Sequence, residues 1–517
     1  MKSVINLSTC AVSRRDALRL TSLVSIGVLA PNLLGGCVGG GGAGAVPDPR
    51  LGFSYPDLAD YSALTWSDAF QAAHEKFSRE YAFGDWKGVD WSGLFDRYQA
   101  RIWRAQSATD DRAYYLALHE YLCAIPDGHL SLSADNPAVP LALAKALAGG
   151  GFGMAVAELD DGRVIAAAVI PGGPADLAGI VAGAEIINWG AQPARNAIES
   201  IAVGAIPYKC LTGAYGNENP QATREHYRLE QARLLTRSAI GATVQVQFRN
   251  PGSALAETAS VTAVEDAGRS FLLLNFAARP AFSSRVDYRT LPQGYGYVLV
   301  TMEYDPASPG YPIRVYEQFR QAITAFVAAA VPGVIIDLRG NYGGSDQLAA
   351  DLCGFFYTVP SFYEEQEYYD KRDGRFLRLT LAERGPEPIV DQLSIEPQTP
   401  HYGGPLVVLV NPGTTSSGEG PPACLARLAN AKVIGFHGTN ASFGMVGGKI
   451  VLPGGYAIGY PFGRSVDQHG VIQLDSRNGV GGVAPNPRVP KTLENVLALA
   501  AGVDVELQYA VNYLDSR

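Results

Sequence analysis

The stretch PLVVLVNPGTTSSGEGPP, residues 405–422, decides the fold because it joins a strand, a turn and the start of a helix. Its first six residues form a short apolar run that is typical of a strand buried in an α/β sheet. Its two closing prolines suit the first turn of a helix, where a missing N–H costs little. Ser416 and Ser417 lie between these elements. A serine there is favoured for chemistry, because the sites of open α/β sheets gather beyond the carboxyl ends of strands, close to helix N-termini.

The same alternation continues on both sides of this stretch. Apolar strands are predicted at residues 295–302, 333–338 and 431–436, and a helix is predicted at residues 421–430. A further helix carries its apolar stripe on Val315, Phe319, Ile323 and Phe326. Residues 266–517 are therefore predicted to form an α/β core.

A second loop, DLRGNYGG at residues 337–344, follows one of these strands. Its paired glycines, Gly343 and Gly344, allow backbone N–H groups to turn toward a ligand, because no Cβ obstructs the approach. One loop could thus supply a nucleophile and the other an oxyanion hole. The alternative is that both are ordinary turns, since Gly, Ser, Thr and Asn are common turn residues.

Residues 55–145 are predicted to form an N-terminal helical domain. Aromatic residues recur there at loosely helical spacing, and we interpret them as core: Trp66, Phe70, Phe77, Trp91, Phe95, Tyr98 and Trp103. The helices end at YLCAIPDGHLSLS, residues 121–133, where Pro-Asp-Gly stops a helix and the following residues alternate like a strand.

Residues 146–265 read as a β-rich module with an insertion. Between Arg163 and Gly190 the pattern predicts a strand, a short helix of small residues and another strand, and residues 200–240 form a charged, helix-prone insertion. This order resembles a PDZ domain, which binds an extended peptide along an open sheet edge. The resemblance implies that the loop 151–153 caps a peptide carboxylate with backbone N–H groups. The alternative is an unrelated small β module.

Three motifs in this order resemble the serine peptidases of the C-terminal processing and tricorn-core type: VIIDLRGNYGG, VLVNPGTTSSGEG and VIGFHGTNASFG. The resemblance extends to FSREYAFGDWKGVDWSGLFDRY, residues 77–98, and covers nearly all of the chain after residue 36. It implies a multidomain α+β protein with a ClpP/crotonase-like catalytic core. It also implies a serine endopeptidase that acts on polypeptides, near C-termini or in unfolded chains.

The resemblance assigns roles to individual residues. Its SxxE pattern makes Ser416 the nucleophile and Glu419 the acidic residue. It implies that Ser417 gives its backbone N–H to the oxyanion hole, with Gly343 or Gly344 giving the second. We interpret the Ser417 side chain itself as a helix cap.

The base differs between the branches of the family. The processing branch uses a lysine, but Met445 stands where it would fall, and Lys449 reads as a surface residue. The tricorn branch uses a histidine before the PDZ module, which implies that His129 of IPDGHLSL is the base. His437 and His469 are the competing histidines.

The orienting glutamate of the tricorn branch is missing from LDSRNGVGGVAPNPRV, residues 474–489. Asp475 or Asn478 could replace it. This departure supports an alternative, namely a weak or inactive member that binds peptides or other ligands as a lipoprotein. A third possibility is another acyl-transfer hydrolase, for example an esterase. No metal spacing and no cofactor motif occurs in the sequence.

The first 36 residues resemble an export signal. SRRDAL at residues 13–18 is similar to a twin-arginine motif, and LGGC at residues 34–37 is similar to a bacterial lipobox that would place lipid on Cys37. The alternative is a plain signal peptide. Residues 37–54 are predicted to form a flexible Gly-rich tether. We therefore expect an exported protein, anchored by lipid and facing the periplasm or the cell surface.

Charge and cysteine content limit the partners. Removing residues 1–36 deletes four positive charges and one negative, which changes the net charge from −9 to −12. This acidic balance, with no basic tract, argues against nucleic acid. The remaining cysteines, Cys123, Cys210, Cys353 and Cys424, allow more than one disulfide pairing. The sequence does not indicate the oligomeric state.

Overall fold

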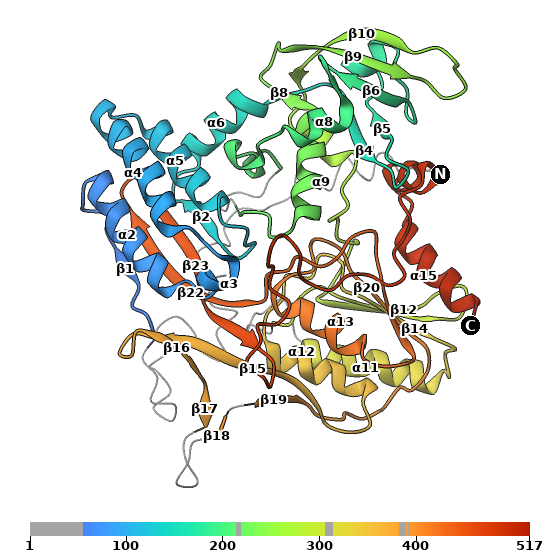
Figure 1. Cartoon of the computed structure of the whole chain (residues 1–517). Coiled ribbons are helices and arrows are strands. Elements are labelled where there is room, and N and C mark those ends of the chain that lie inside the picture. The colour runs from blue at the N-terminus through green and yellow to red at the C-terminus, as the bar shows by residue number, and fades with distance from the viewer. Residues whose placement is uncertain (1–54, 213–218, 305–313, 382–388, 391) are drawn as a thin grey trace, which may run out of the picture.

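The computed structural model describes residues 55–212, 219–304, 314–381, 389–390 and 392–517. The expected signal peptide, the twin-arginine and lipobox motifs, Cys37 and the Gly-rich tether lie outside these residues. The described chain is a mixed α+β protein with several modules and a helical N-terminal part, as expected (Figure 1). None of the helices in the described part is long and apolar enough to cross a membrane.

A five-stranded sheet with strand order β12-β13-β14-β20-β21 carries the serine turn and the glycine loop. Its strands are β12 (Val286–Thr290), β13 (Gly296–Val300), β14 (Val334–Asp337), β20 (Leu406–Leu409) and β21 (Ala431–Ile434). The last four run parallel, and β12 is the antiparallel edge. The strands predicted from the apolar runs are confirmed.

Helices cover both faces of this sheet. Side chains of alternate strand residues point to opposite faces, so Ile336 and Val408 belong to one apolar cluster and Ile335 and Val407 to another. The first face is covered by α11 (Val315–Ala328), α12 (Asp346–Cys353), the 3₁₀ turn η4 (Gly354–Phe356) and α13 (Gly420–Leu425). The second face is covered by α15 (Val505–Asp515), with α14 (Leu493–Ala500) beside it.

The helix after the serine turn is shorter than predicted. A 3₁₀ turn, η5 (Ser416–Glu419), comes first, and α13 then ends at Leu425 instead of continuing to Asn430. The Asn430 amide donates to the carbonyl of Gly404 at 2.6 Å, which ties this segment to the chain entering β20. The two prolines do occupy the first turn of α13, as predicted.

A second sheet joins the N-terminal helices to distant strands. The helices are α2 (Trp66–Glu80), α3 (Gly84–Lys87), α4 (Trp91–Ala108), α5 (Asp111–Cys123) and α6 (Ala138–Ala148). The sheet contains β1 (Ala59–Asp60), β22 (Gly444–Leu452), β23 (Tyr456–Val466), β15 (Ser361–Asp370) and β16 (Arg375–Arg378), with β2 (Ser131–Ala134) on β23 and β19 (Gln392–Ile395) on β15. Figure 1 shows β22 and β23 lying beside α2 and α5.

One hydrophobic core serves the helices and these strands together. Phe70 and Phe77 of α2 share it with Ile458 and Tyr460 of β23. The interpretation of Trp103 as core is wrong, because this side chain is 58% exposed. The buried residues of α4 include Ile102, and the next residue along a helix projects about 100° away from it.

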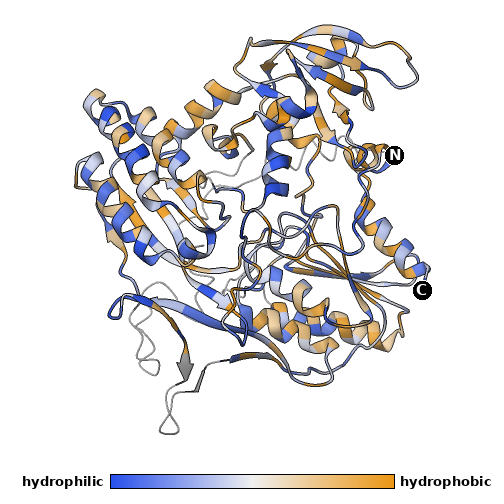
Figure 2. Cartoon of the chain, viewed as in Figure 1, coloured by the Kyte–Doolittle hydropathy of each residue, from blue (hydrophilic) through white to orange (hydrophobic). Residues whose placement is uncertain are grey.

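The β-rich module contains a sheet of order β10-β9-β6-β5-β4. Its strands and helices in chain order are β3 (Gly150–Gly151), β4 (Met154–Glu158), β5 (Val164–Val169), α7 (Pro174–Leu177), β6 (Glu185–Trp189), β7 (Gln192–Pro193), α8 (Ala194–Glu199), η2 (Val203–Ala205), η3 (Lys209–Thr212), α9 (Arg224–Leu235), β8 (Arg237–Ser238), β9 (Thr243–Arg249), β10 (Glu257–Thr262), β11 (Val264–Glu265) and α10 (Arg269–Leu272). The predicted strand, helix and strand between Arg163 and Gly190 are β5, α7 and β6. Figure 2 shows α9 as largely hydrophilic, in keeping with a charged insertion.

Two smaller features complete the described chain. Strands β17 (Thr380–Leu381) and β18 (Ile389–Val390) pair with each other. Cys123, Cys210, Cys353 and Cys424 carry free thiols, so none of the disulfide pairings left open by the sequence is formed.

Candidate active site

The serine turn holds Ser416 in an unusual backbone conformation. Ser416 has φ 57°, in the left-handed region, and its side chain is buried. Such a residue stores roughly 1–3 kcal/mol of strain and persists only where its surroundings enforce it. Here the Ser416 N–H donates to the Ser442 carbonyl at 3.0 Å, and the Thr415 N–H donates to the Asn341 carbonyl at 2.9 Å. The turn is thus fixed from two sides.

The glycine loop lies directly against this turn. A Cβ on Gly343 would lie 2.6 Å from the Ser416 Cβ and 2.8 Å from the Ser417 nitrogen, so only glycine allows this approach. Asn341 shapes the loop, because its Oδ1 accepts the Gly343 N–H at 2.8 Å and its Nδ2 donates to Glu303 Oε1 at 2.7 Å. Burial raises the pKa of Glu303 to about 8.

Two backbone N–H groups beside Ser416 are available to a ligand. Among the hydrogen bonds between described residues, none uses the N–H of Ser417 or of Gly344. The Gly343 N–H is occupied by Asn341, so Gly344 is the better placed of the two glycines predicted for the oxyanion hole. The interpretation of the Ser417 side chain as a helix cap is wrong. Its Oγ donates to the Gly344 carbonyl at 3.0 Å, because the turn faces the glycine loop rather than the first turn of α13.

Glu419 anchors the segment that supports Ser416. Its carboxylate accepts the Thr439 hydroxyl at 2.5 Å and the N–H groups of Ala441 and Ser442 at 2.8 and 2.9 Å. The side chain is fully buried, and this burial raises its pKa to about 8. Glu419 therefore positions the Ser442 carbonyl that receives the Ser416 N–H.

His129 lies on the loop between α5 and β2, and this loop is bound to the same segment. The Gly128 N–H donates to Ser442 Oγ at 2.9 Å, and the Gly444 N–H donates to His129 Nδ1 at 3.3 Å. Asp127 holds the loop from within, since it accepts the His129 N–H at 2.8 Å and the Tyr81 hydroxyl at 2.6 Å. The structure thus brings the loops of Ser416 and His129 together on residues 442–444.

The contacts of the His129 ring identify its protonation state. A backbone N–H only donates, so Nδ1 is the acceptor and a neutral ring carries its proton on Nε2. Burial lowers the pKa of His129 below its ordinary value, which favours this neutral form.

Of the two candidates for orienting His129, Asp475 is engaged elsewhere and Asn478 is exposed. Asp475 accepts Lys87 Nζ at 2.5 Å through one oxygen and the Phe443 N–H at 3.1 Å through the other. Its pKa is raised to about 7, chiefly by burial. Asn478 is exposed.

Sequence reasoning missed Lys87. This buried lysine also donates to Ser476 Oγ, which in turn donates to the Pro126 carbonyl at 3.0 Å, next to the His129 loop. The only signal was a lysine inside an aromatic stretch.

The competing residues have other surroundings. His437 is buried, and its Nδ1 lies 3.0 Å from Glu225 Oε1. His469 is exposed in the turn after β23. Met445, at the position of the alternative lysine base, is buried, and Lys449 is half-buried. In the loop 151–153 the Phe152 N–H donates to the Thr236 carbonyl at 3.1 Å, so it is occupied.

Comparisons with known proteins agree with this geometry. Residues 295–487 match the model of peptidase family S41, and residues 62–112 match the tricorn protease C1 domain. No curated protein sequence matches the chain.

Solved structures with a similar fold include mature CPAF, with 15% identity and a TM-score of 0.55 over 87% of this chain and 95% of that one. Mature CPAF complexed with lactacystin has 14% identity and a TM-score of 0.53, and the match covers 87% of this chain and 97% of that one. The photosystem II D1 C-terminal processing protease matches at 18% identity with a TM-score of 0.36, and the match covers 86% of this chain and 98% of that one. The resemblance expected from the sequence is confirmed: residues 295–487 match peptidase family S41, and this part of the chain is a serine-type peptidase domain.

Proposed function

We propose that the chain is an endopeptidase that cleaves polypeptides through an acyl-enzyme on Ser416, with His129 as the base. The observation that carries this proposal is the meeting of three loops at one buried turn. Ser416 has a strained backbone, two unengaged N–H groups lie beside it, and the His129 loop is bound to the segment that receives the Ser416 N–H.

The reaction would proceed by acyl transfer. His129 takes the proton of Ser416 Oγ as that oxygen attacks a peptide carbonyl, and the N–H groups of Ser417 and Gly344 stabilise the oxyanion. His129 then protonates the leaving amine, and water completes the cycle. To accept the proton at Nε2, the ring must give up the Gly444 contact and move its proton to Nδ1.

The rest of the chain would select the substrate. We propose that residues 146–265 form a PDZ-like module and that residues 266–517 form a ClpP/crotonase-like core. Strand β4 pairs only with β5 among the described strands, and Arg228 of α9 lies beside it, with its Nε 2.6 Å from Glu158 Oε2. This free edge supports addition of a peptide strand, and hence a preference for chain ends or unfolded chains.

Export and a lipid anchor on Cys37 also remain part of the proposal, supported by the order of the N-terminal motifs. Replacing Cys37 with serine should abolish incorporation of labelled palmitate in cells that express the whole chain. Continued incorporation into the Cys37→Ser protein would exclude this anchor.

One observation favours a second candidate, a peptide-binding protein of low activity. The His129 lone pair at Nδ1 is occupied, and both oxygens of Asp475 have other partners. Such a protein would bind C-terminal peptides without cleaving them.

A fluorophosphonate probe that labels activated serines separates these candidates. Wild type should be labelled, Ser416→Ala should not, and His129→Ala should lose roughly 10²–10⁴-fold in rate, the usual contribution of a general base. His469→Ala is the matched control, because His469 is exposed and its substitution should leave labelling unchanged. Folded wild type that takes no label and binds peptides would support the binding protein instead.

A further inference from the structure

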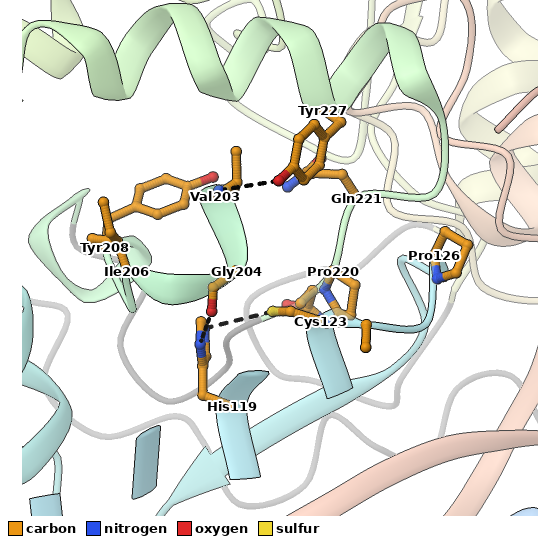
Figure 3. A pocket seen from close by; sticks show the side chains of 12 residues that line it. His119, Cys123, Pro126, Val203, Gly204, Ile206, Tyr208, Pro220, Gln221 and Tyr227 are labelled. Atoms are coloured by element: carbon orange, nitrogen blue, oxygen red, sulfur yellow. Dashed lines mark hydrogen bonds between the residues drawn. The ribbon is translucent and has the colours of Figure 1, made fainter. Parts of the chain in front are cut away.

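A second nucleophile and base pair lies away from the serine turn, in a cavity of about 220 Å³. The cavity separates the end of α5 from the turn η2 and the start of α9 (Figure 3). His119 and Cys123 lie one helical turn apart on α5 and point to the same side. The peptidase reaction uses neither of them.

The hydrogen bonds of His119 define the direction of proton transfer. Its Nδ1 lies 2.9 Å from the Gly204 carbonyl, which only accepts, so Nδ1 carries the proton of the neutral ring. Its Nε2 then presents a lone pair to Cys123 Sγ at 3.7 Å, and the thiol is the donor (Figure 3). A thiol, a base and a group that orients the base are the parts of an activated cysteine.

The wall opposite Cys123 is built closely around it. A Cβ on Gly204 would lie 2.7 Å from the Cys123 Cβ, so only glycine lets η2 approach the thiol and the histidine together. Cys123 is half-buried, whereas Cys210, Cys353 and Cys424 are buried. Its exposure distinguishes Cys123 from these three thiols.

The cavity favours a small uncharged reactant. Among the described residues, its lining includes Tyr208, Tyr227 and Gln221 but no Asp, Glu, Lys or Arg. A charged group would enter without a partner, which is costly. The volume is below the roughly 300–1,000 Å³ of typical ligand pockets, so a long peptide would not fit.

The cavity also touches the His129 loop and one residue that binds it. Asn219 lines it and donates through Nδ2 to the carbonyls of Gly128 and Leu130, at 3.3 and 2.8 Å, on either side of His129. Pro126, which begins the loop, lines the cavity as well. The cavity thus lies directly beside the His129 loop.

We propose that Cys123 and His119 form a thiol-exchange site for a small, uncharged disulfide, and that the mixed disulfide displaces the His129 loop. His119 Nε2 takes the thiol proton, and Cys123 Sγ attacks one sulfur of the disulfide. A new S–S bond forms, the old one breaks, and the leaving thiolate takes the proton from His119. Cys123 is oxidised, and the small disulfide is reduced to one free thiol. The second half of this proposal rests on the proposed role of His129.

The exchange is tested on the full chain with bis(2-hydroxyethyl) disulfide, followed by peptide mapping under native conditions. Cys123 should react about tenfold or more faster than Cys210, Cys353 and Cys424. The substitution His119→Asn should slow the reaction of Cys123 about tenfold. The doubly charged 3,3′-dithiodipropionate should react with Cys123 more slowly than the uncharged disulfide does. Cys210→Ser is the matched control and should leave the rate at Cys123 unchanged.

Equal rates at all four cysteines in wild type would overturn the site, even if His119→Asn does not fold. The coupling has its own readout: Cys123 modification should reduce fluorophosphonate labelling severalfold, a reductant should restore it, and Cys123→Ser should be insensitive to the disulfide. Unchanged labelling of modified wild type would overturn the coupling alone. Absence of any label on untreated wild type would contradict the proposed function and leave the exchange result standing.

Discussion

Gly343 is the residue at which the serine turn tolerates least change. The missing side chain lets the glycine loop touch Ser416 and Ser417 at once. Gly343→Ala would add both a clash and a left-handed backbone penalty of about 1–2 kcal/mol. We expect fluorophosphonate labelling to fall about 100-fold or more, as happens when an oxyanion donor is lost.

Gly294→Ala is the control for this substitution. Gly294 has φ 91°, close to the 83° of Gly343, but nothing lies within 4 Å of its added Cβ. The Gly294→Ala variant should have a similar backbone penalty, but at a position away from the serine turn. It should therefore be labelled at the wild-type rate. Equal labelling of both variants would mean that the contact with Ser416 has no role in the reaction.

His129 should impose a characteristic pH dependence. Its pKa lies below the ordinary value of 6.5, because burial disfavours the charged ring and Lys87 adds a positive charge nearby. Only the neutral ring can act as a base, and it predominates above that pKa. The rate of Ser416 labelling should therefore rise with a midpoint below pH 6.5 and stay level at neutral pH. A midpoint above pH 7 would point to another base.

At the scale of elements, the segment 439–444 links the loops of Ser416 and His129, and Glu419 holds this segment. The substitution Glu419→Gln replaces one accepting oxygen with an amide N–H₂ group, which cannot accept a hydrogen bond from the buried donors. This should lower the free energy of unfolding by about 1–3 kcal/mol. Labelling should fall as well, because the Ser442 carbonyl supports Ser416. Urea unfolding measures the first effect.

Glu494→Gln on the exposed first turn of α14 is the control and should stay within about 0.5 kcal/mol of wild type. If Glu419→Gln unfolds at the same urea concentration as this control, the three hydrogen bonds of Glu419 do not stabilise the segment.

Helices and strands could be predicted from the sequence where a local pattern of residues is enough to define them. Apolar runs located β13, β14, β20 and β21, because strands covered on both faces have no polar side. The early end of α13 was not predictable, since the Asn430 side chain bonds to a distant carbonyl. The choice between Gly343 and Gly344 depends on the Asn341 amide, whose direction no sequence pattern reveals.

At the scale of the whole molecule, a buried ion pair that no local pattern predicts joins the two ends of the chain. Lys87 and Asp475 are 388 residues apart in sequence, and both side chains are buried. Lys87→Met would leave Asp475 as an unpaired buried carboxylate, which costs about 3–5 kcal/mol. We expect a matching loss of unfolding free energy, measured by urea denaturation.

Lys87→Met combined with Asp475→Leu should recover much of this loss, because no charge then stays buried without a partner. Lys371→Met is the control: Lys371 pairs with the exposed Asp57, and its loss should leave stability unchanged. A Lys87→Met protein as stable as this control would mean that the buried pair does not join the two ends of the chain.

The strands β22 and β23 complete the core of α2 and α5 from the far end of the chain. The hydrogen bond from Tyr460 to Glu80 spans 380 residues. At roughly 5–20 residues per second, a ribosome needs about 20–80 seconds to make that length. The N-terminal helices therefore leave the ribosome with an unfinished apolar face and require shielding until the last part arrives. It follows that a chain that terminates before residue 439 lacks the segment that supports Ser416, and it leaves the apolar face of the N-terminal helices uncovered.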